Sequence, residues 1–260
     1  MQKEEGRIAI ISGGGSGIGR AAALRLAEEG MKLCLLDLKE ERAEKVAQDI
    51  QEQGGEAFVA DVDVSDPNRV MQGIEQAVQK WGRVDVVFAN AGINGKVAPI
   101  ETLSPEDWNQ TLSTNLTSTF YLVKYSLPYL QKQGGSIIIT SSINGNRTFS
   151  NIGMSAYSTS KAGQVAFMKM AALELAKYKI RVNAVCPGAI ETNIGQNTEK
   201  TKELKKVEIP IKFPKGQQPL EHGPGQPEQV AELVYFLASD ASSHITGTEI
   251  YIDGAESLLT

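Results

Sequence analysis

The stretch Arg7-Ile-Ala-Ile-Ile-Ser-Gly-Gly-Gly-Ser-Gly-Ile-Gly19 decides the fold of this chain. Its first half is an apolar run typical of a buried strand, and its second half is a glycine-rich turn that opens a helix extending to Gly30. Because Gly13, Gly17 and Gly19 carry no side chain, the backbone can turn tightly there and approach a phosphate group. Strand, glycine turn and helix in this order predict a phosphate-binding site at the start of a helix.

The rest of the chain repeats this alternation of short apolar runs and longer segments of helical period. Predicted strands cover residues 7–12, 31–38, 57–62, 84–89, 136–141, 180–186 and 249–252. Predicted helices cover residues 17–30, 40–53, 66–81, 105–131 with a break near Asn115, 157–178 and 227–239. Strands that are apolar on both faces need helices on both sides of a parallel sheet. We therefore expect an α/β, Rossmann-type doubly wound parallel sheet of about seven strands, formed by one domain over residues 1–260.

Composition limits the classes of function. The chain has 260 residues, of which 41% are hydrophobic and 22% charged, and its net charge is −5. No run of Lys and Arg predicts a nucleic-acid surface, residues 1–7 lack the apolar stretch of a signal peptide, and no apolar run approaches the roughly 18 residues of a membrane span. We expect a cytoplasmic protein without nucleic-acid or membrane partners. Cys34 and Cys186 lie in apolar runs, which favours buried thiols over a disulfide, and His and Cys are too scattered to predict a metal site.

Residues 193–226 interrupt the alternation of strands and helices. They contain Pro210, Pro214, Pro219 and Pro224, and a loop of this length inside a compact domain is usually functional. We predict a lid over the substrate in this segment. A surface insertion without a function is the alternative.

Asp37 ends the second predicted strand, 18 residues after Gly19. A carboxylate at this place accepts hydrogen bonds from the adenosine ribose hydroxyls and repels a 2′-phosphate. Leu38 follows it where an arginine would favour a phosphate, and Ser16 rather than a basic residue lies in the glycine turn. The sequence therefore predicts NAD as the cofactor, with NADP less favoured. Lys39 is the one residue that could soften this preference.

Tyr157 and Lys161 are four residues apart, about 140 residues after the glycine turn. One turn of helix puts both side chains on the same face. A nearby ammonium favours the phenolate, so we expect Lys161 to lower the pKa of Tyr157 from the usual value of about 10. A proton donor is needed when a nicotinamide transfers hydride to a carbonyl, because negative charge then develops on oxygen. A hydride carrier and a proton donor together suit the interconversion of an alcohol and a ketone.

Five motifs in order resemble the short-chain dehydrogenase/reductase family, over about residues 6–255. They are the glycine turn, Asn90-Ala91-Gly92 after the fourth strand, Ser141-Ser142 after the fifth, Tyr157-x3-Lys161, and Pro187-Gly188 after the sixth. The resemblance implies a single-domain enzyme that assembles as a homotetramer or homodimer. In this family the subunits commonly meet through two long central helices, which here would be residues 105–131 and 157–178.

The resemblance also implies roles at the matching positions. Tyr157 would be the general acid/base, Lys161 would bind the ribose, Ser142 would polarise the substrate oxygen, and Asn115 would kink its helix and hold a proton-relay water. Cofactor contacts are implied for Asp37, Tyr157 and Lys161 and for the following residues: Gly13, Ser16, Gly17, Ile18, Gly19, Asp63, Val64, Asn90, Gly92, Pro187, Gly188, Ile190 and Thr192.

The chain departs from the family pattern in two places and leaves the role of one serine open. The stretch between Ser142 and Tyr157 is two residues longer than usual, which predicts a loop of its own shape above the site. Ser141 could take the role of the serine, although Ser142 precedes Gly145 by three residues, as the pattern prefers. Ala255 occupies a position where a second glycine is usual.

The expected substrate pocket comprises residues 93–99, residues 143–155 and the lid. These segments mix asparagines with apolar side chains, and Arg147 could either recognise a carboxylate or phosphate or face solvent. The function we expect is NAD-dependent interconversion of a secondary alcohol, such as a sugar or polyol, and a ketone. Reduction of a 3-oxoacyl thioester and a non-catalytic nucleotide-binding scaffold stay open as alternatives.

Overall fold

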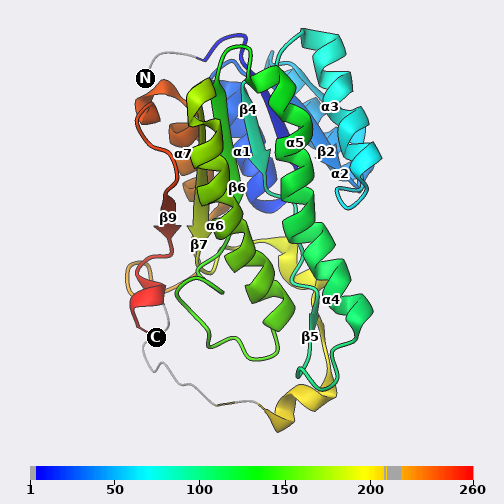
Figure 1. Ribbon diagram of the computed structural model, residues 1–260, viewed down its shortest axis with the longest axis vertical. Coiled ribbons are helices and arrows are strands. Elements are labelled where there is room, and N and C mark those ends of the chain that lie inside the picture. The colour runs from blue at the N-terminus through cyan, green and yellow to red at the C-terminus, as the bar shows by residue number, and fades with distance from the viewer. Residues whose placement is uncertain (1–3, 208, 210–217, 260) are drawn as a thin grey trace.

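Seven parallel strands form one sheet in the computed structural model, which describes residues 4–207, 209 and 218–259 (Figure 1). Their order across the sheet is β3-β2-β1-β4-β6-β7-β9. The strands are β1 (Ile8–Ser12), β2 (Lys32–Asp37), β3 (Ala57–Asp61), β4 (Val86–Ala89), β6 (Gly135–Thr140), β7 (Ile180–Pro187) and β9 (Glu249–Ile252). The predicted doubly wound sheet is confirmed.

The described residues contain seven α-helices, six of which cover the two faces of this sheet. They are α1 (Gly17–Glu28), α2 (Glu40–Glu52), α3 (Pro67–Trp81), α4 (Pro105–Leu112), α5 (Ser118–Leu130), α6 (Ser155–Leu175) and α7 (Pro227–Ala238). Helices α3, α5 and α6 lie on one face of the sheet, and α1, α2 and α7 lie on the other (Figure 1). The buried side chains of each group pack in a separate hydrophobic cluster. Local sequence sets the helix ends: Asp66 accepts a hydrogen bond from the Asn68 N–H before α3, and Gly82 ends that helix in a left-handed conformation.

The order in which the chain adds strands to the sheet reverses between β1 and β4. From β1 it builds outward through β2 and β3, and it then returns to add β4 on the other side of β1. At such a switch point the loops that leave neighbouring strands diverge, so a crevice forms at the carboxyl ends of the strands.

The helix predicted for residues 105–131 is confirmed, together with its predicted break near Asn115. A π-helical turn, Ser113–Thr117, separates α4 from α5. Such turns widen the helix by one residue and often occur at functional sites. The helix predicted for residues 157–178 begins two residues earlier than expected, and its last turn, Ala176–Tyr178, is a 3-10 helix.

The first part of the predicted lid lies against the loop that follows β4. Two short strands, β5 (Lys96–Val97) and β8 (Glu199–Lys200), pair in parallel. Asn94 also donates a hydrogen bond of 2.8 Å to the Thr198 hydroxyl, and the Thr201 N–H donates to the Val97 carbonyl. The segment after β7 is therefore tied to the segment after β4. Residues 208 and 210–217 of the predicted lid lie outside the described residues.

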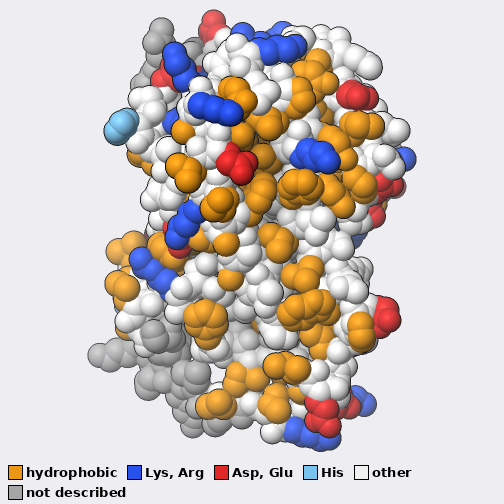
Figure 2. Space-filling model, viewed as in Figure 1, with side chains coloured by type: hydrophobic (Ala, Val, Ile, Leu, Met, Phe, Trp, Pro, Cys, Tyr) orange, Lys and Arg blue, Asp and Glu red, His pale blue; other side chains and the backbone are white. Residues whose placement is uncertain are grey.

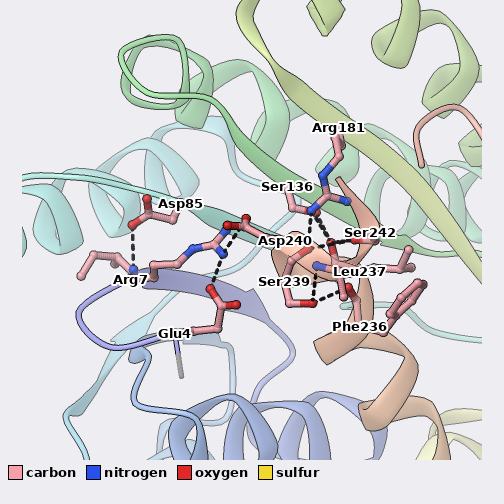
Figure 3. Close-up of polar contacts among 12 residues, drawn as sticks. Glu4, Arg7, Asp85, Ser136, Arg181, Phe236, Leu237, Ser239, Asp240 and Ser242 are labelled. Atoms are coloured by element: carbon pink, nitrogen blue, oxygen red, sulfur yellow. Dashed lines mark hydrogen bonds and ion pairs between the residues drawn. The ribbon is translucent and has the colours of Figure 1, made fainter. Parts of the chain in front are cut away.

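A polar network ties the amino ends of the strands to the end of α7 (Figure 3). Arg181, near the start of β7, donates hydrogen bonds to the carbonyls of Leu237 and Ser239 at 2.8 and 3.1 Å. The Ser136 hydroxyl of β6 donates to the same Leu237 carbonyl at 2.7 Å. Arg7 pairs with Glu4 close by. These donors satisfy carbonyl groups that the last turn of α7 leaves unpaired, so the helix is anchored beneath the sheet.

Two expectations from composition concern membrane spans and cysteines. In the part of the chain that the structure describes, no helix is both long enough and apolar enough to cross a bilayer. Cys34 and Cys186 are buried and unpaired. Within the same residues, no group of three or more potential His, Cys, Asp or Glu ligands is placed to bind a metal.

Candidate active site

A cavity of about 460 Å³ opens at the carboxyl ends of the central strands. It brings together most of the predicted site residues: Gly13, Ser16, Gly17, Ile18, Asn90, Gly92, Ser142, Tyr157, Lys161, Pro187, Gly188, Ile190 and Thr192. Five predicted site residues do not line it: Gly19, Asp37, Asp63, Val64 and Asn115.

The glycine turn presents the start of α1 to this cavity. Gly13 and Gly17 have φ angles of 67° and 50°, a left-handed conformation that favours glycine. Ser16 precedes the helix but makes no capping hydrogen bond with its side chain, so N–H groups of the first turn are free to bind an anion. A Cβ added to Gly17 would lie 3.2 Å from the Thr192 side chain. A narrow passage lined by free N–H groups fits the pyrophosphate of a dinucleotide.

Asn90 joins the ends of three strands behind the glycine turn. Its side-chain amide donates to the Ser12 carbonyl at 3.2 Å, and its Oδ1 accepts a hydrogen bond of 3.1 Å from the Thr140 hydroxyl. Gly19 packs directly against this side chain, since an added Cβ would lie 2.7 Å from Asn90 Nδ2. Gly19 and Asn90 therefore set the shape of the cavity from behind.

Asp37 lies beside the glycine turn at the end of β2. Its Oδ2 accepts a hydrogen bond from the Gly15 N–H, and its Oδ1 accepts one from the Lys39 N–H, both at 2.9 Å. Asp63 accepts two hydrogen bonds from Ser65, through the backbone N–H and the hydroxyl. The carboxylate of Asp37 is thus held in a fixed orientation at the end of the sheet where an adenosine would lie.

Tyr157, Ser142 and Lys161 meet at the inner end of the cavity. The Ser142 side chain lies close enough to the Tyr157 phenol to favour its ionised form. Lys161 is buried, and its Nζ donates to the Thr140 carbonyl at 2.7 Å and lies 5.6 Å from the centre of the Tyr157 ring. The Ser141 hydroxyl instead donates to the Lys161 carbonyl at 2.8 Å. Ser142, rather than Ser141, therefore contacts the phenol.

The electrostatics of this group differ from the expectation. Burial raises the pKa of Tyr157, and the nearby Ser142 side chain offsets only part of that rise. Burial disfavours the charged form of Lys161 as well, and because that form is the protonated one, its pKa falls to about 8. The predicted lowering of the pKa of Tyr157 by Lys161 is not seen in this structure, where burial of the phenol sets the direction of the shift and the ammonium does not contribute. A raised pKa keeps Tyr157 protonated at neutral pH, in the form that donates a proton.

Asn115 is fully buried in the π-helical turn, next to the cavity. Its side-chain Oδ1 accepts from the Ile93 N–H at 2.9 Å, and its amide donates to the Ser160 hydroxyl at 3.0 Å. A Cβ added to Gly92 would lie 3.2 Å from Asn115 Oδ1 and 3.6 Å from Lys161 Nζ. The side-chain oxygen of Asn115 and the ammonium therefore border the same narrow space.

Gln164 is a buried residue of this site that the sequence motifs did not single out. Its Nε2 donates to the Asn115 carbonyl at 2.8 Å and to the Thr119 hydroxyl at 2.9 Å. The Thr119 hydroxyl donates to the same carbonyl at 2.9 Å. A carbonyl has two lone pairs, so these two donors saturate it. A relay water on Asn115 would then have to bind the side-chain oxygen.

Three charged residues near the site differ in whether the sequence pointed to their positions. Arg42, in the first turn of α2, and Glu256, after β9, both line the cavity. Arg147 does not line it: its guanidinium stacks 3.5 Å from the centre of the Tyr251 ring and is exposed. The solvent-facing alternative for Arg147 therefore agrees with the structure. The position of Arg42 five residues after Asp37 was a usable signal, whereas nothing local marked Glu256.

Comparison with known proteins gives consistent matches along nearly the whole chain. A family model described as enoyl-(acyl carrier protein) reductase matches residues 13–255. A 3-oxoacyl-[acyl-carrier-protein] reductase from Thermotoga maritima is 38% identical over 253 residues, which cover 96% of this chain and 97% of the relative. A cyclohexanol dehydrogenase from Acinetobacter sp. is 37% identical, covering 97% of this chain and 96% of the relative.

A solved structure shows the same fold at high similarity. The crystal structure of a 3-ketoacyl-ACP reductase from Sinorhizobium meliloti 1021 superposes with a TM-score of 0.92 at 45% identity, covering 97% of this chain and 100% of that one. The relatives therefore include proteins named for reducing acyl substrates and proteins named for oxidising a cyclic alcohol.

Proposed function

The chain belongs to the short-chain dehydrogenase/reductase family, and on that premise we propose that it is an NAD-dependent enzyme that interconverts a secondary alcohol and a ketone. Sugars and polyols are among the candidate substrates. The observation that carries the proposal is one cavity lined by the glycine turn, Ser142, Tyr157 and Lys161. The proposal puts the enzyme in the cytoplasm, where buried unpaired thiols stay reduced.

Each residue of this group has a distinct proposed task. When bound, the nicotinamide cofactor supplies or accepts the hydride. Tyr157 gives a proton to the substrate oxygen in reduction and takes it in oxidation, while Ser142 orients that oxygen by hydrogen bonding. Lys161 binds the ribose, and Asn115 supports exchange of the proton with water. Residues 193–207 form the first part of the lid that covers the substrate.

The proposed preference for NAD depends on Asp37. Its carboxylate is held by the Gly15 and Lys39 N–H groups, and hydrogen bonds of this kind stabilise the charged form. A fixed negative charge there accepts ribose hydroxyls and repels a 2′-phosphate. Arg42 is an exposed residue near the same end of the cavity and could attract a 2′-phosphate. Measuring activity with NAD and with NADP therefore shows whether Asp37 or Arg42 sets the cofactor preference.

A second candidate function is reduction of a 3-oxoacyl thioester. The names of the Thermotoga and Sinorhizobium relatives favour it. The carboxylate of Asp37 argues against it, since such reductases normally use NADPH. An overall charge of −5 also offers no general attraction to an acidic carrier protein.

The deciding experiment is a panel of secondary alcohols, sugars and polyols assayed with NAD and with NADP. We expect at least one alcohol to produce NADH, with kcat/KM at least about tenfold higher for NAD than for NADP. A 3-oxoacyl thioester tested in the reverse direction is the comparison substrate. Turnover of the thioester far above every alcohol would favour the second candidate, and no turnover of any compound would favour the scaffold.

We further propose that the exposed face of α5 and α6 packs against a second copy of the chain. Figure 2 shows hydrophobic side chains gathered over these two helices. Phe120, Met170 and Leu173 on this face are 43%, 59% and 76% exposed. Exposed apolar patches of this kind mark protein interfaces, and a homodimer or homotetramer built on the two helices would bury them.

Leu173→Glu is expected to shift the assembly toward smaller species, because a buried unpaired carboxylate opposes association. Light scattering after gel filtration measures the mass of each species. Leu38→Glu, which adds the same charge at an exposed apolar residue away from α5 and α6, is the matched control. A parent that is already monomeric, or an unchanged mass in Leu173→Glu, would contradict the proposed interface.

A further inference from the structure

Glu256 brings a carboxylate from the end of the chain back to the wall of the cavity. After β9, Asp253 accepts hydrogen bonds from the Ala255 N–H at 3.1 Å and the Ser257 N–H at 3.0 Å. Ala255 takes a left-handed conformation with φ 69°, and a short 3-10 helix, Glu256–Leu258, follows. This turn aims the Glu256 side chain toward the segment that follows β7.

The carboxylate contacts the backbone of that segment directly. Glu256 Oε2 accepts a hydrogen bond of 2.9 Å from the Ala189 N–H. A Cβ added to Gly188 would lie 2.8 Å from the same oxygen, so the close approach depends on a glycine at that position. Pro187, Gly188, Ala189 and Glu256 all line the cavity, and residues 187–192 are the segment proposed to hold the nicotinamide.

The charged side chains around the cavity are distributed unevenly. Among the residues that line it, the charged ones are Arg42, Lys161 and Glu256. Arg42 borders the glycine turn, at the opposite end from the tyrosine. No ion pair found within residues 4–207, 209 and 218–259 includes Glu256. The carboxylate therefore faces the nicotinamide end without a cation of its own.

We infer that Glu256 makes the cavity favour the oxidised, positively charged nicotinamide over the neutral reduced ring. The inference rests on the proposed function and deepens it, because tighter binding of the oxidised cofactor favours alcohol oxidation. A buried ammonium at Lys161 repels the positive ring, and the carboxylate of Glu256, which lines the same cavity, offsets that repulsion. For charges partly screened by water, the expected contribution is about 3- to 10-fold in affinity.

Glu256→Gln tests the charge while keeping the contact. Glutamine retains the size of the side chain and an oxygen that accepts the Ala189 N–H, and it removes the negative charge. Calorimetric titration of NAD⁺ and NADH should show NAD⁺ binding weakened about 3- to 10-fold and NADH binding unchanged or slightly tighter. The difference should shrink at high salt. Glu75→Gln, an exposed carboxylate on α3 outside the cavity, should leave both affinities unchanged.

A second variant separates the charge from the hydrogen bond. Glu256→Asp keeps the charge and shortens the side chain, so both affinities fall together while their ratio stays near that of the parent. Equal changes for NAD⁺ and NADH in Glu256→Gln, or a larger loss for NADH, would overturn the inference and leave Glu256 with a structural role. A parent protein that binds neither form would refute the proposed function instead.

Discussion

Tyr157→Phe is expected to lower kcat about a thousandfold while changing the affinity for NAD⁺ by less than about threefold. The substitution removes one oxygen atom and leaves the ring, so packing in the cavity is preserved. It also removes the phenol hydroxyl next to Ser142, which is the group proposed to exchange a proton with the substrate oxygen. Steady-state turnover of the alcohol found in the panel and calorimetric titration of NAD⁺ provide the two measurements.

The matched control for this variant is Tyr178→Phe. Tyr178 lies in the 3-10 turn after α6, outside the cavity, and loses the same hydroxyl. We expect parental turnover in this control. Near-parental turnover in Tyr157→Phe would mean that another group moves the proton, and the proposed role of Tyr157 would have to be abandoned.

Gly19→Ala should abolish measurable dinucleotide binding, an effect of at least about a hundredfold. An added Cβ would overlap the Gly13 carbonyl and lie 2.7 Å from Asn90 Nδ2. Neither neighbour can yield easily, because Gly13 belongs to the turn itself and Asn90 is tied to Ser12 and Thr140. The turn must therefore open, and α1 no longer presents its free N–H groups to the pyrophosphate.

Gly223→Ala is the control for a methyl group added to a glycine. Apart from its chain neighbours, no heavy atom of the described residues lies within 4 Å of the Cβ that it would gain, so binding and stability should match the parent. Circular dichroism and a thermal melt of Gly19→Ala show whether the variant folds. A folded Gly19→Ala protein that binds NAD⁺ normally would show that the glycine turn does not hold the pyrophosphate.

The sheet could be predicted from the sequence because its strands are apolar on both faces. A run such as Ile137-Ile138-Ile139 has no polar face, so it must be central and covered by helices on both sides. The alternation with helical segments then implied parallel crossovers. The pairing of β5 with β8 could not be predicted, because strands of two residues leave no period to recognise.

Site residues could be predicted from the sequence where the local backbone or spacing requires one residue type. They could not be predicted where packing between distant elements gives a residue its role. Glycines with positive φ and a tyrosine one turn before a lysine leave local signals. Gln164 carries no such signal: on sequence it is one of several polar residues in its helix, and its role emerges only where α6 crosses the π-helical turn. The same holds for the pKa of Tyr157, which depends on burial that spacing alone does not reveal.

The anchoring of α7 by Arg181 and Ser136 has an evolutionary consequence. Those bonds lie at the amino ends of the strands, whereas the cavity lies at their carboxyl ends. They therefore do not depend on the loops that select a substrate. Such loops can mutate at little thermodynamic risk to the framework. A framework of this kind would let one fold serve different substrates, and relatives that share most of their length with this chain are named for substrates as different as a 3-oxoacyl-[acyl-carrier-protein] and cyclohexanol.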